Sequence, residues 1–248
     1  MGLWFTFLLG FFIILGALIV FYTDNNDKFI EFSISLASGV ILMLIAFDLV
    51  PEMIEVVPYK GWFKYFAIFS GIGFGFILLK VLDKFIPDHD DDETTDEDDQ
   101  RNLEHIGLMS TIALIIHNIV EGMAIYMLAT SDMKAAFITC IGIGLHNIPM
   151  GMVIASAFYQ QNESKKKTFT ILGAVSLSTF VGGLSMFLFK LGKYVDILEA
   201  ISITLTIGML LFILIMELIP KMKRSKDKRI TSAGFLTGIV LLLITLAF

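Results

Sequence analysis

The nine residues His117-Asn-Ile-Val-Glu-Gly-Met-Ala-Ile125 recur as His146-Asn-Ile-Pro-Met-Gly-Met-Val-Ile154, with six of the nine positions identical. A second repeat joins more distant segments, because the stretch from Gly39 to Pro51 returns in the stretch from Gly208 to Pro220. Each copy has a Gly, an acid nine positions on and a Pro three beyond. Polar residues and Pro are rare in such apolar surroundings, so we read both pairs as internal repeats.

The composition assigns these repeats to a membrane protein. Hydrophobic residues make up 56% of the 248 residues, charged residues 17%, and the mean hydropathy is +0.81. Soluble proteins average about 45–50% apolar and about 25% charged residues. A membrane-spanning helix needs about 20 mostly apolar residues. Eight such runs predict an all-α, polytopic fold within one transmembrane domain, residues 1–248: Gly2–Tyr22, Phe29–Val50, Trp62–Leu82, Ile106–Leu128, Ala135–Tyr159, Thr168–Leu191, Ile197–Ile219 and Ile230–Phe248.

The basic residues predict how the chain is oriented. Twelve Lys or Arg residues follow the odd-numbered spans, whereas five lie in or beside the loops that follow spans 2, 4 and 6. Basic residues accumulate in cytoplasmic loops. We therefore expect both termini to lie outside the cytoplasm, with the chain in the cell (plasma) membrane. In this orientation the two copies of each repeat cross the membrane in opposite directions, which is typical of secondary transporters.

The polar residues of the shorter repeat predict a metal site. His117 and Glu121 lie four apart and share a helix face, and His146 and Met150 have the same spacing. If the two helices face each other, two imidazoles, a carboxylate and a thioether converge, and such groups bind divalent transition metals. The alternative is that these groups only satisfy one another's hydrogen bonds. Ionisable groups inside a membrane usually mark a substrate path, which favours the metal site.

These paired motifs, His-Asn-x-x-Glu-Gly and His-Asn-Ile-Pro-x-Gly, resemble those of the ZIP (Zrt/Irt-like) metal transporters. The eight spans and the Asp-Leu-Val-Pro and Glu-Leu-Ile-Pro segments are similar too. The resemblance implies a 3+2+3 helix arrangement with spans 4 and 5 at its centre. It implies uptake into the cytoplasm of zinc, or of iron, manganese, cobalt, cadmium or copper. It also implies that the transport site includes five residues: His117, Asn118, Glu121, His146 and Asn147.

This chain departs from the family pattern at three places. Met150 stands where the second motif normally has Glu, and Val120 where the first often has Pro. Span 6, around residues 176–183, lacks the acid that completes a second metal site in many bacterial members. We therefore expect one principal ion. A thioether in place of a carboxylate favours zinc, Cu(I) or cadmium over harder ions such as manganese.

Two acidic features lie outside the central motifs. Residues 86–104 are predicted to form an acidic cytoplasmic loop, with nine acids between Asp88 and Asp99. It is either a solvated linker or a weak collector of arriving ions. Asp48 and Glu217 are expected to end spans 2 and 7 at opposite membrane faces. They serve either as entry and exit ligands or as ordinary helix ends.

Two other functions compete with transport. One is a metal-binding sensor or degenerate member that moves no ion, which Met150 keeps open. The other is an intramembrane metallohydrolase, but such enzymes carry Glu directly after the first His, where this chain has Asn118. We expect no enzyme activity, no resident cofactor and no nucleic-acid partner. The expected partners are the metal ion and the lipid bilayer, and a homodimer stays open.

Overall fold

The computed structural model describes the chain except for residues 24–26, 85–95, 161–164, 190–194 and 246–248. The described residues form helices only and contain no strand. The elements are α1 (Gly2–Tyr22), α2 (Asp27–Leu44), η1 (Ile45–Leu49), α3 (Val50–Val56), α4 (Trp62–Asp83), α5 (Asp96–Ser131), α6 (Met133–Gln160), α7 (Lys165–Phe189), α8 (Val195–Phe212), η3 (Ile213–Leu218), α9 (Ile219–Arg224) and α10 (Lys228–Thr245).

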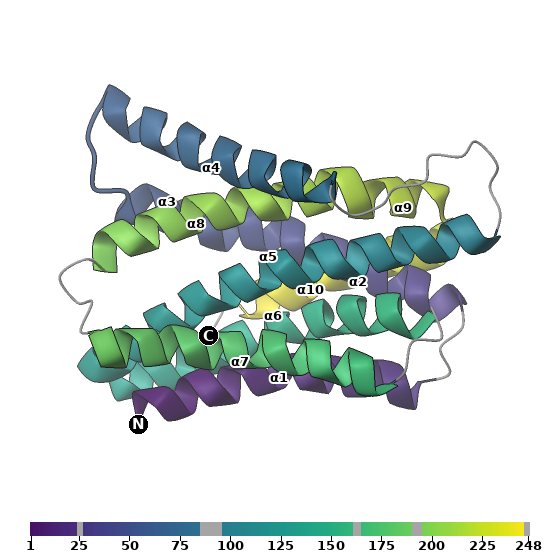
Figure 1. Cartoon of the computed structure of the whole chain (residues 1–248), viewed down its shortest axis with the longest axis horizontal. Coiled ribbons are helices and arrows are strands. Elements are labelled where there is room, and N and C mark those ends of the chain that lie inside the picture. The colour runs from purple at the N-terminus through teal and green to yellow at the C-terminus, as the bar shows by residue number, and fades with distance from the viewer. Residues whose placement is uncertain (24–26, 85–95, 161–164, 190–194, 246–248) are drawn as a thin grey trace.

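Eight helical segments of the described chain are long and apolar enough to cross a membrane, which confirms the predicted number. A lipid-exposed chain must satisfy its backbone hydrogen bonds internally, so continuous helices are the expected solution. Figure 1 shows the long helices side by side with their connections at two opposite ends. The N-terminus lies at one end, which also carries the α3–α4 connection; we call it the N-terminal end.

The repeated Pro residues do not end their helices, which corrects the sequence-based prediction. The chain passes from α2 through η1 into α3, and from α8 through η3 into α9. In both places one turn is π-helical, and the N–H of the residue before Pro bonds the carbonyl five residues back. Pro lacks an N–H and clashes with the preceding turn, so the helix widens there and continues. Asp48 and Glu217 therefore lie inside π-helical turns.

The acidic segment is partly helical, which corrects the expectation that all of residues 86–104 form a loop. Helix α5 begins at Asp96, well before the predicted start at Ile106. Its first residues are Asp96, Glu97, Asp98 and Asp99, and negative charges stabilise the N-terminal turn of a helix through its dipole. The remainder of the acidic segment, residues 86–95, lies outside the described residues.

Glycines of the shorter repeat allow α1, α5, α6 and α7 to pack as one bundle (Figure 1). A β-carbon on Gly122 of α5 would overlap the backbone carbonyl of Thr179 in α7. At the equivalent position of α6, a β-carbon on Gly151 would overlap the carbonyl of Ile13 in α1. Small residues let membrane helices approach this closely. Equivalent residues of the two copies thus make equivalent contacts.

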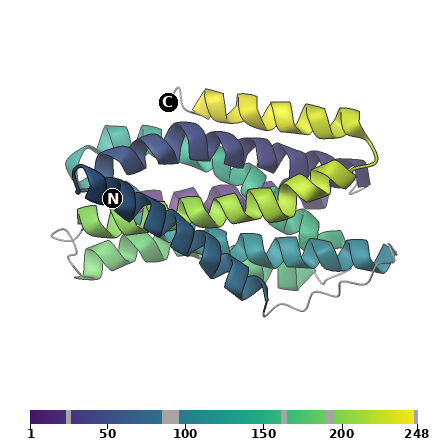
Figure 2. The ribbon, with the colours of Figure 1, turned by 90° about the horizontal axis from the view of Figure 1, so that it is seen from above.

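The remaining spans pack as two pairs. Gly39 of α2 lies against the backbone of α10, and Gly208 of α8 lies against the backbone of α4. Gly39 and Gly208 begin the two copies of the longer repeat, so these contacts also correspond. Figure 2 shows α10 running along α2 at the edge of the molecule. The central bundle and the two pairs enclose the polar residues of α5 and α6.

Candidate metal site

Three buried side chains from α5 and α6 meet at one point. Nε2 of His117 lies 2.8 Å from Oε1 of Glu121, and Nε2 of His146 lies 3.0 Å from the same oxygen. These residues form a group whose ligand atoms all lie within 4.8 Å of one another. Each is more than nine-tenths buried. The sequence repeat and the helical spacing thus bring together the three ionisable groups that the motif predicts.

The contacts among these groups leave a ring nitrogen of His117 available to bind an ion. Nε2 of His117 is close to Glu121 but not in a hydrogen-bonding direction, so this buried nitrogen has no hydrogen-bond partner. Buried polar atoms without partners are uncommon and call for an explanation. Two imidazole nitrogens and a carboxylate oxygen are a common ligand set for zinc and related divalent ions. The three groups can therefore coordinate one ion directly.

Two asparagines flank the ligands. Nδ2 of Asn147 donates to Oε2 of Glu121 at 3.1 Å, which holds the carboxylate with its other oxygen toward the imidazoles. Nδ2 of Asn118 instead donates to the carbonyl of Val175 in α7, at 3.2 Å. The Oδ1 atoms of both asparagines are buried without a hydrogen-bond partner. Asn147 thus holds the Glu121 carboxylate in place, whereas Asn118 connects α5 to α7.

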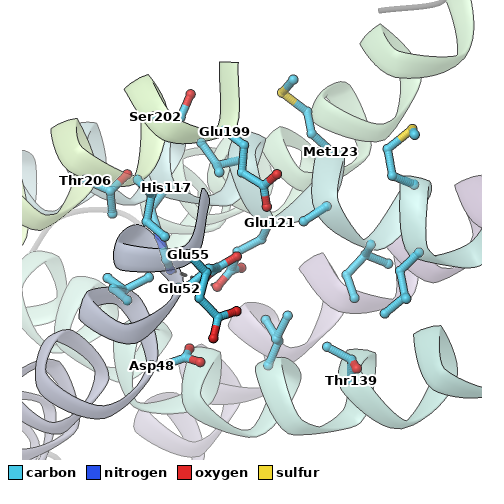
Figure 3. A pocket seen from close by; sticks show the side chains of 18 of the residues that line it. Asp48, Glu52, Glu55, His117, Glu121, Met123, Thr139, Glu199, Ser202 and Thr206 are labelled. Atoms are coloured by element: carbon cyan, nitrogen blue, oxygen red, sulfur yellow. Dashed lines mark ion pairs between the residues drawn. The ribbon is translucent and has the colours of Figure 1, made fainter. Parts of the chain in front are cut away.

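A cavity of about 560 Å³ reaches this site from the N-terminal end. We call it the vestibule; it is lined by His117 and Glu121, by residues of η1, α3, the C-terminal half of α5 and the first half of α8, and by Thr139 and Ile143 of α6. Besides Glu121, its acidic residues are Asp48, Glu52, Glu55 and Glu199. Figure 3 shows these carboxylates around the space in front of Glu121.

A second, much smaller cavity lies on the opposite side of the site. Its volume is about 10 Å³, and it is lined by Ala37, Ile41, Ser110, Leu114, Met150, Val153, Leu210, Ile213 and Leu218. We call it the small cavity. Along α5, Ser110 and Leu114 of its lining precede His117, which lines the vestibule. The site therefore lies between a wide cavity that carries several carboxylates and a nearly closed apolar one.

Comparison with known proteins agrees with this arrangement. Residues 87–246 match the family model described as ZIP zinc transporter. This chain belongs to the ZIP family. It is 27% identical to the zinc transporter ZupT of Streptococcus mutans over 94% of this chain and 91% of that protein. It is 25% identical to ZupT of Corynebacterium aurimucosum, over 94% and 90%, and 24% identical to ZupT of Oceanobacillus iheyensis, over 93% and 91%.

Membership of the ZIP family confirms the resemblance stated from the motifs. ZIP proteins are metal-ion transporters rather than enzymes, so the metallohydrolase alternative falls away. The eight apolar helices make this ZIP protein a multi-pass membrane protein. The two motifs that carry the resemblance are the segments that hold His117, Glu121 and His146 together.

The other predicted site residues of this ZIP chain are distributed around the site. Asp48 lines the vestibule. Met150 is 5% exposed and lines the small cavity, not the vestibule. Glu217 lies half-buried in η3 and, within the described part of the chain, lines neither cavity. The structure thus places Asp48 and Met150 in different cavities.

Several polar residues of the vestibule wall have no role predicted from the sequence: Glu52, Glu55, Glu199, Ser202 and Thr206. The first two follow Asp48 at positions four and seven, a spacing that places all three on one helix face. On α8, Glu199, Ser202 and Thr206 have a similar helical spacing. Both spacings can be seen in the sequence. The sequence does not show that the helix face with Asp48 and the face of α8 line the same cavity.

Proposed function

We propose that this protein moves a divalent transition-metal ion, zinc foremost, across the membrane through the site formed by His117, Glu121 and His146. The convergence of these three buried groups at the end of a polar cavity carries the proposal. The relatives named zinc transporters support zinc as the ion. Iron, manganese, cobalt, cadmium and copper are the other ions that imidazole and carboxylate donors can hold.

We assign the remaining motif residues supporting roles at this site. Asn147 orients Glu121 through the hydrogen bond at 3.1 Å, and Asn118 fixes α5 against α7. Met150 lies one helical turn beyond His146 and lines the small cavity. Its sulfur is therefore placed to meet the ion on the side away from the vestibule. With Glu121 as the single coordinating carboxylate, a divalent ion keeps about one positive charge.

We propose that transport runs from outside into the cytoplasm of the cell, across the plasma membrane. The excess of Lys and Arg after the odd-numbered spans supports an outward-facing N-terminus. The vestibule then opens outward, and Asp48 lies on the entry side. Glu217 lies toward the cytoplasmic side, where it can receive the departing ion. A divalent ion gains roughly 4.6 kcal/mol across 100 mV, inside negative.

The equivalent glycine contacts of the two repeats support the 3+2+3 inverted arrangement and one transmembrane domain that extends over residues 1–248. An inverted repeat builds two similar half-paths that meet at mid-membrane. The two cavities on either side of the site correspond to such half-paths. One is open and polar, and the other is closed.

Removal of one ligand tests the site. We expect His146→Ala to reduce saturable zinc uptake by reconstituted protein by about 100-fold or more, since changes next to a ligand alone cost about 10–100-fold in affinity. The matched control is His105→Ala, which removes an imidazole that belongs to neither repeated motif. Bound zinc per protein and initial uptake rate should both fall. Normal uptake by the His146 variant would contradict the assignment, and zinc binding without any uptake by the wild type would favour a sensor.

A further inference from the structure

We propose that the vestibule holds a hydrated divalent cation at a separate outer site, formed by Glu199 of α8 with Glu52 and Glu55 of α3. The ion waits there before it loses water and binds at the His117–Glu121–His146 centre. This inference rests on the proposed transport function and adds to it a second binding position. It also assigns a function to the face of α8 that lines the vestibule. This face, which we call the wall of α8, lies outside both repeats.

The wall of α8 faces the acids of α3 across the vestibule. Glu199, Ser202 and Thr206 are separated by three and four positions, so they follow one face of the helix, and all three line the cavity. In Figure 3 the carboxylate of Glu199 points toward Glu121, with Glu52 and Glu55 on the facing helix. Glu55 is exposed, whereas Glu52 and Glu199 are half-buried. The carboxylates thus extend from the mouth toward the centre.

The spacing of these carboxylates indicates that the outer ion keeps its water. Among the described residues, the only group of three or more possible ligands within 4.8 Å of one another is His117, Glu121 and His146. The vestibule acids therefore do not converge closely enough to chelate an ion. Six water molecules occupy about 180 Å³, and the vestibule of about 560 Å³ has room for them. Carboxylates acting through water suit this arrangement.

A buried hydroxyl at the base of the same wall supports a hydrated ligand. Thr206 is 1% exposed, and its Oγ1 lacks a hydrogen-bond partner although it lines the cavity. Thr206 and His117 both line this cavity and are both drawn in Figure 3. Buried hydroxyl groups are nearly always hydrogen-bonded, and water that bridges polar groups satisfies them well. Water carried by the cation supplies the partner that the protein does not.

A hydrated outer site discriminates poorly between divalent ions, and this property makes it testable. Mg²⁺ gives up its water reluctantly and prefers oxygen ligands. It should therefore occupy the outer site without passing to the imidazoles. Millimolar Mg²⁺ should raise the apparent KM for zinc, leave the maximal rate unchanged and not itself be transported.

The experiment measures initial zinc uptake by full-length protein in proteoliposomes, with Mg²⁺ or with sodium chloride of equal ionic strength. We expect Glu199→Gln to raise the KM for zinc by roughly threefold to tenfold, because a charged cavity raises the local cation concentration. The maximal rate of zinc uptake by this variant should equal that of the wild type, and the inhibition of its uptake by Mg²⁺ should be at least threefold weaker. Asp132→Asn is the matched control: Asp132 caps α6 at the N-terminal end outside the vestibule, and Asn caps helices equally well.

A second pair of variants tests the hydroxyl. Thr206→Val should raise the KM for zinc, whereas Thr206→Ser, which keeps the hydroxyl, should retain the wild-type value. If the wild type takes up zinc and depends on His146, but Glu199→Gln shows the wild-type KM and Mg²⁺ sensitivity, the outer site is overturned and the central site stands. If the wild type neither binds nor takes up zinc, the proposed function itself fails.

Discussion

The two cavities beside the metal site differ in size and in chemistry. The vestibule has a volume of about 560 Å³ and carries four acidic residues besides Glu121. The small cavity has about 10 Å³ and, apart from Ser110, an apolar lining. The two share no lining residue. A cavity of about 10–15 Å³ is the smallest that admits one water molecule, so the second side is closed to a hydrated ion.

This difference means that an ion at the centre meets unlike surroundings in its two directions of travel. On the vestibule side, carboxylates and water can stabilise the charge of the ion. On the side of the small cavity, apolar side chains such as Leu114 and Ile213 cannot stabilise this charge. Moving a charge into apolar surroundings without partners is costly. Under the proposed function, this structure is a state in which the ion enters from the vestibule and the path through the small cavity is closed.

Thiol accessibility should show the largest contrast between the two cavities. We substitute cysteine for Ser202 in the vestibule or Val153 in the small cavity, in a Cys140→Ala background so that the introduced thiol is the only one in the chain. A charged, membrane-impermeant reagent should modify Ser202→Cys about 100-fold faster or more, since a residue that lacks solvent contact reacts only through rare openings. Equal rates, measured by mass spectrometry on purified protein in detergent, where the reagent reaches both ends, without added metal, would show that the apolar side is open.

A carboxylate placed in the small cavity should make its chemistry more like that of the vestibule. Met150→Glu adds one negative charge one turn from His146, which should balance the excess charge of a divalent ion. We expect about a tenfold rise in the ratio of manganese to zinc uptake, because hard ions prefer carboxylate to thioether. Met150→Gln, which adds an oxygen without charge, is the control. An unchanged ratio in competitive uptake would mean that residue 150 does not contact the ion.

Acidification should weaken zinc binding at the centre and should have the smallest effect of the three changes. An imidazole must be neutral to bind a metal, so protons compete with zinc for His117 and His146. Zinc uptake at subsaturating metal should fall severalfold from about pH 7.5 to about pH 5.5 because of this competition. Binding measured at the same pH values should fall in parallel. Uptake that rises on acidification would indicate that protons drive transport.

Much of the fold could be predicted because its signals are local. A span is recognisable from about 20 apolar residues alone, and α1 begins and ends as predicted. The convergence of three ionisable groups was also predictable, because His117 and Glu121 share a helix face and the repeat supplies His146. The π-helical turns were not, since Pro51 and Pro220 indicate helix ends as readily as a widened turn. The early start of α5 was hidden by the high charge of its first residues.

The sequence by itself determined the eight spans, the repeats and the three ionisable groups that meet at the centre, because spacing along one helix and duplication of a motif are properties of the chain. Only the tertiary structure decided that Glu199 faces Glu52, that Met150 lies in the small cavity, and that one side of the site is open. These facts depend on how α8 and α3 are placed against α5. Glycine contacts with the backbones of neighbouring helices set such placements, and contacts between distant segments cannot be read from local spacing.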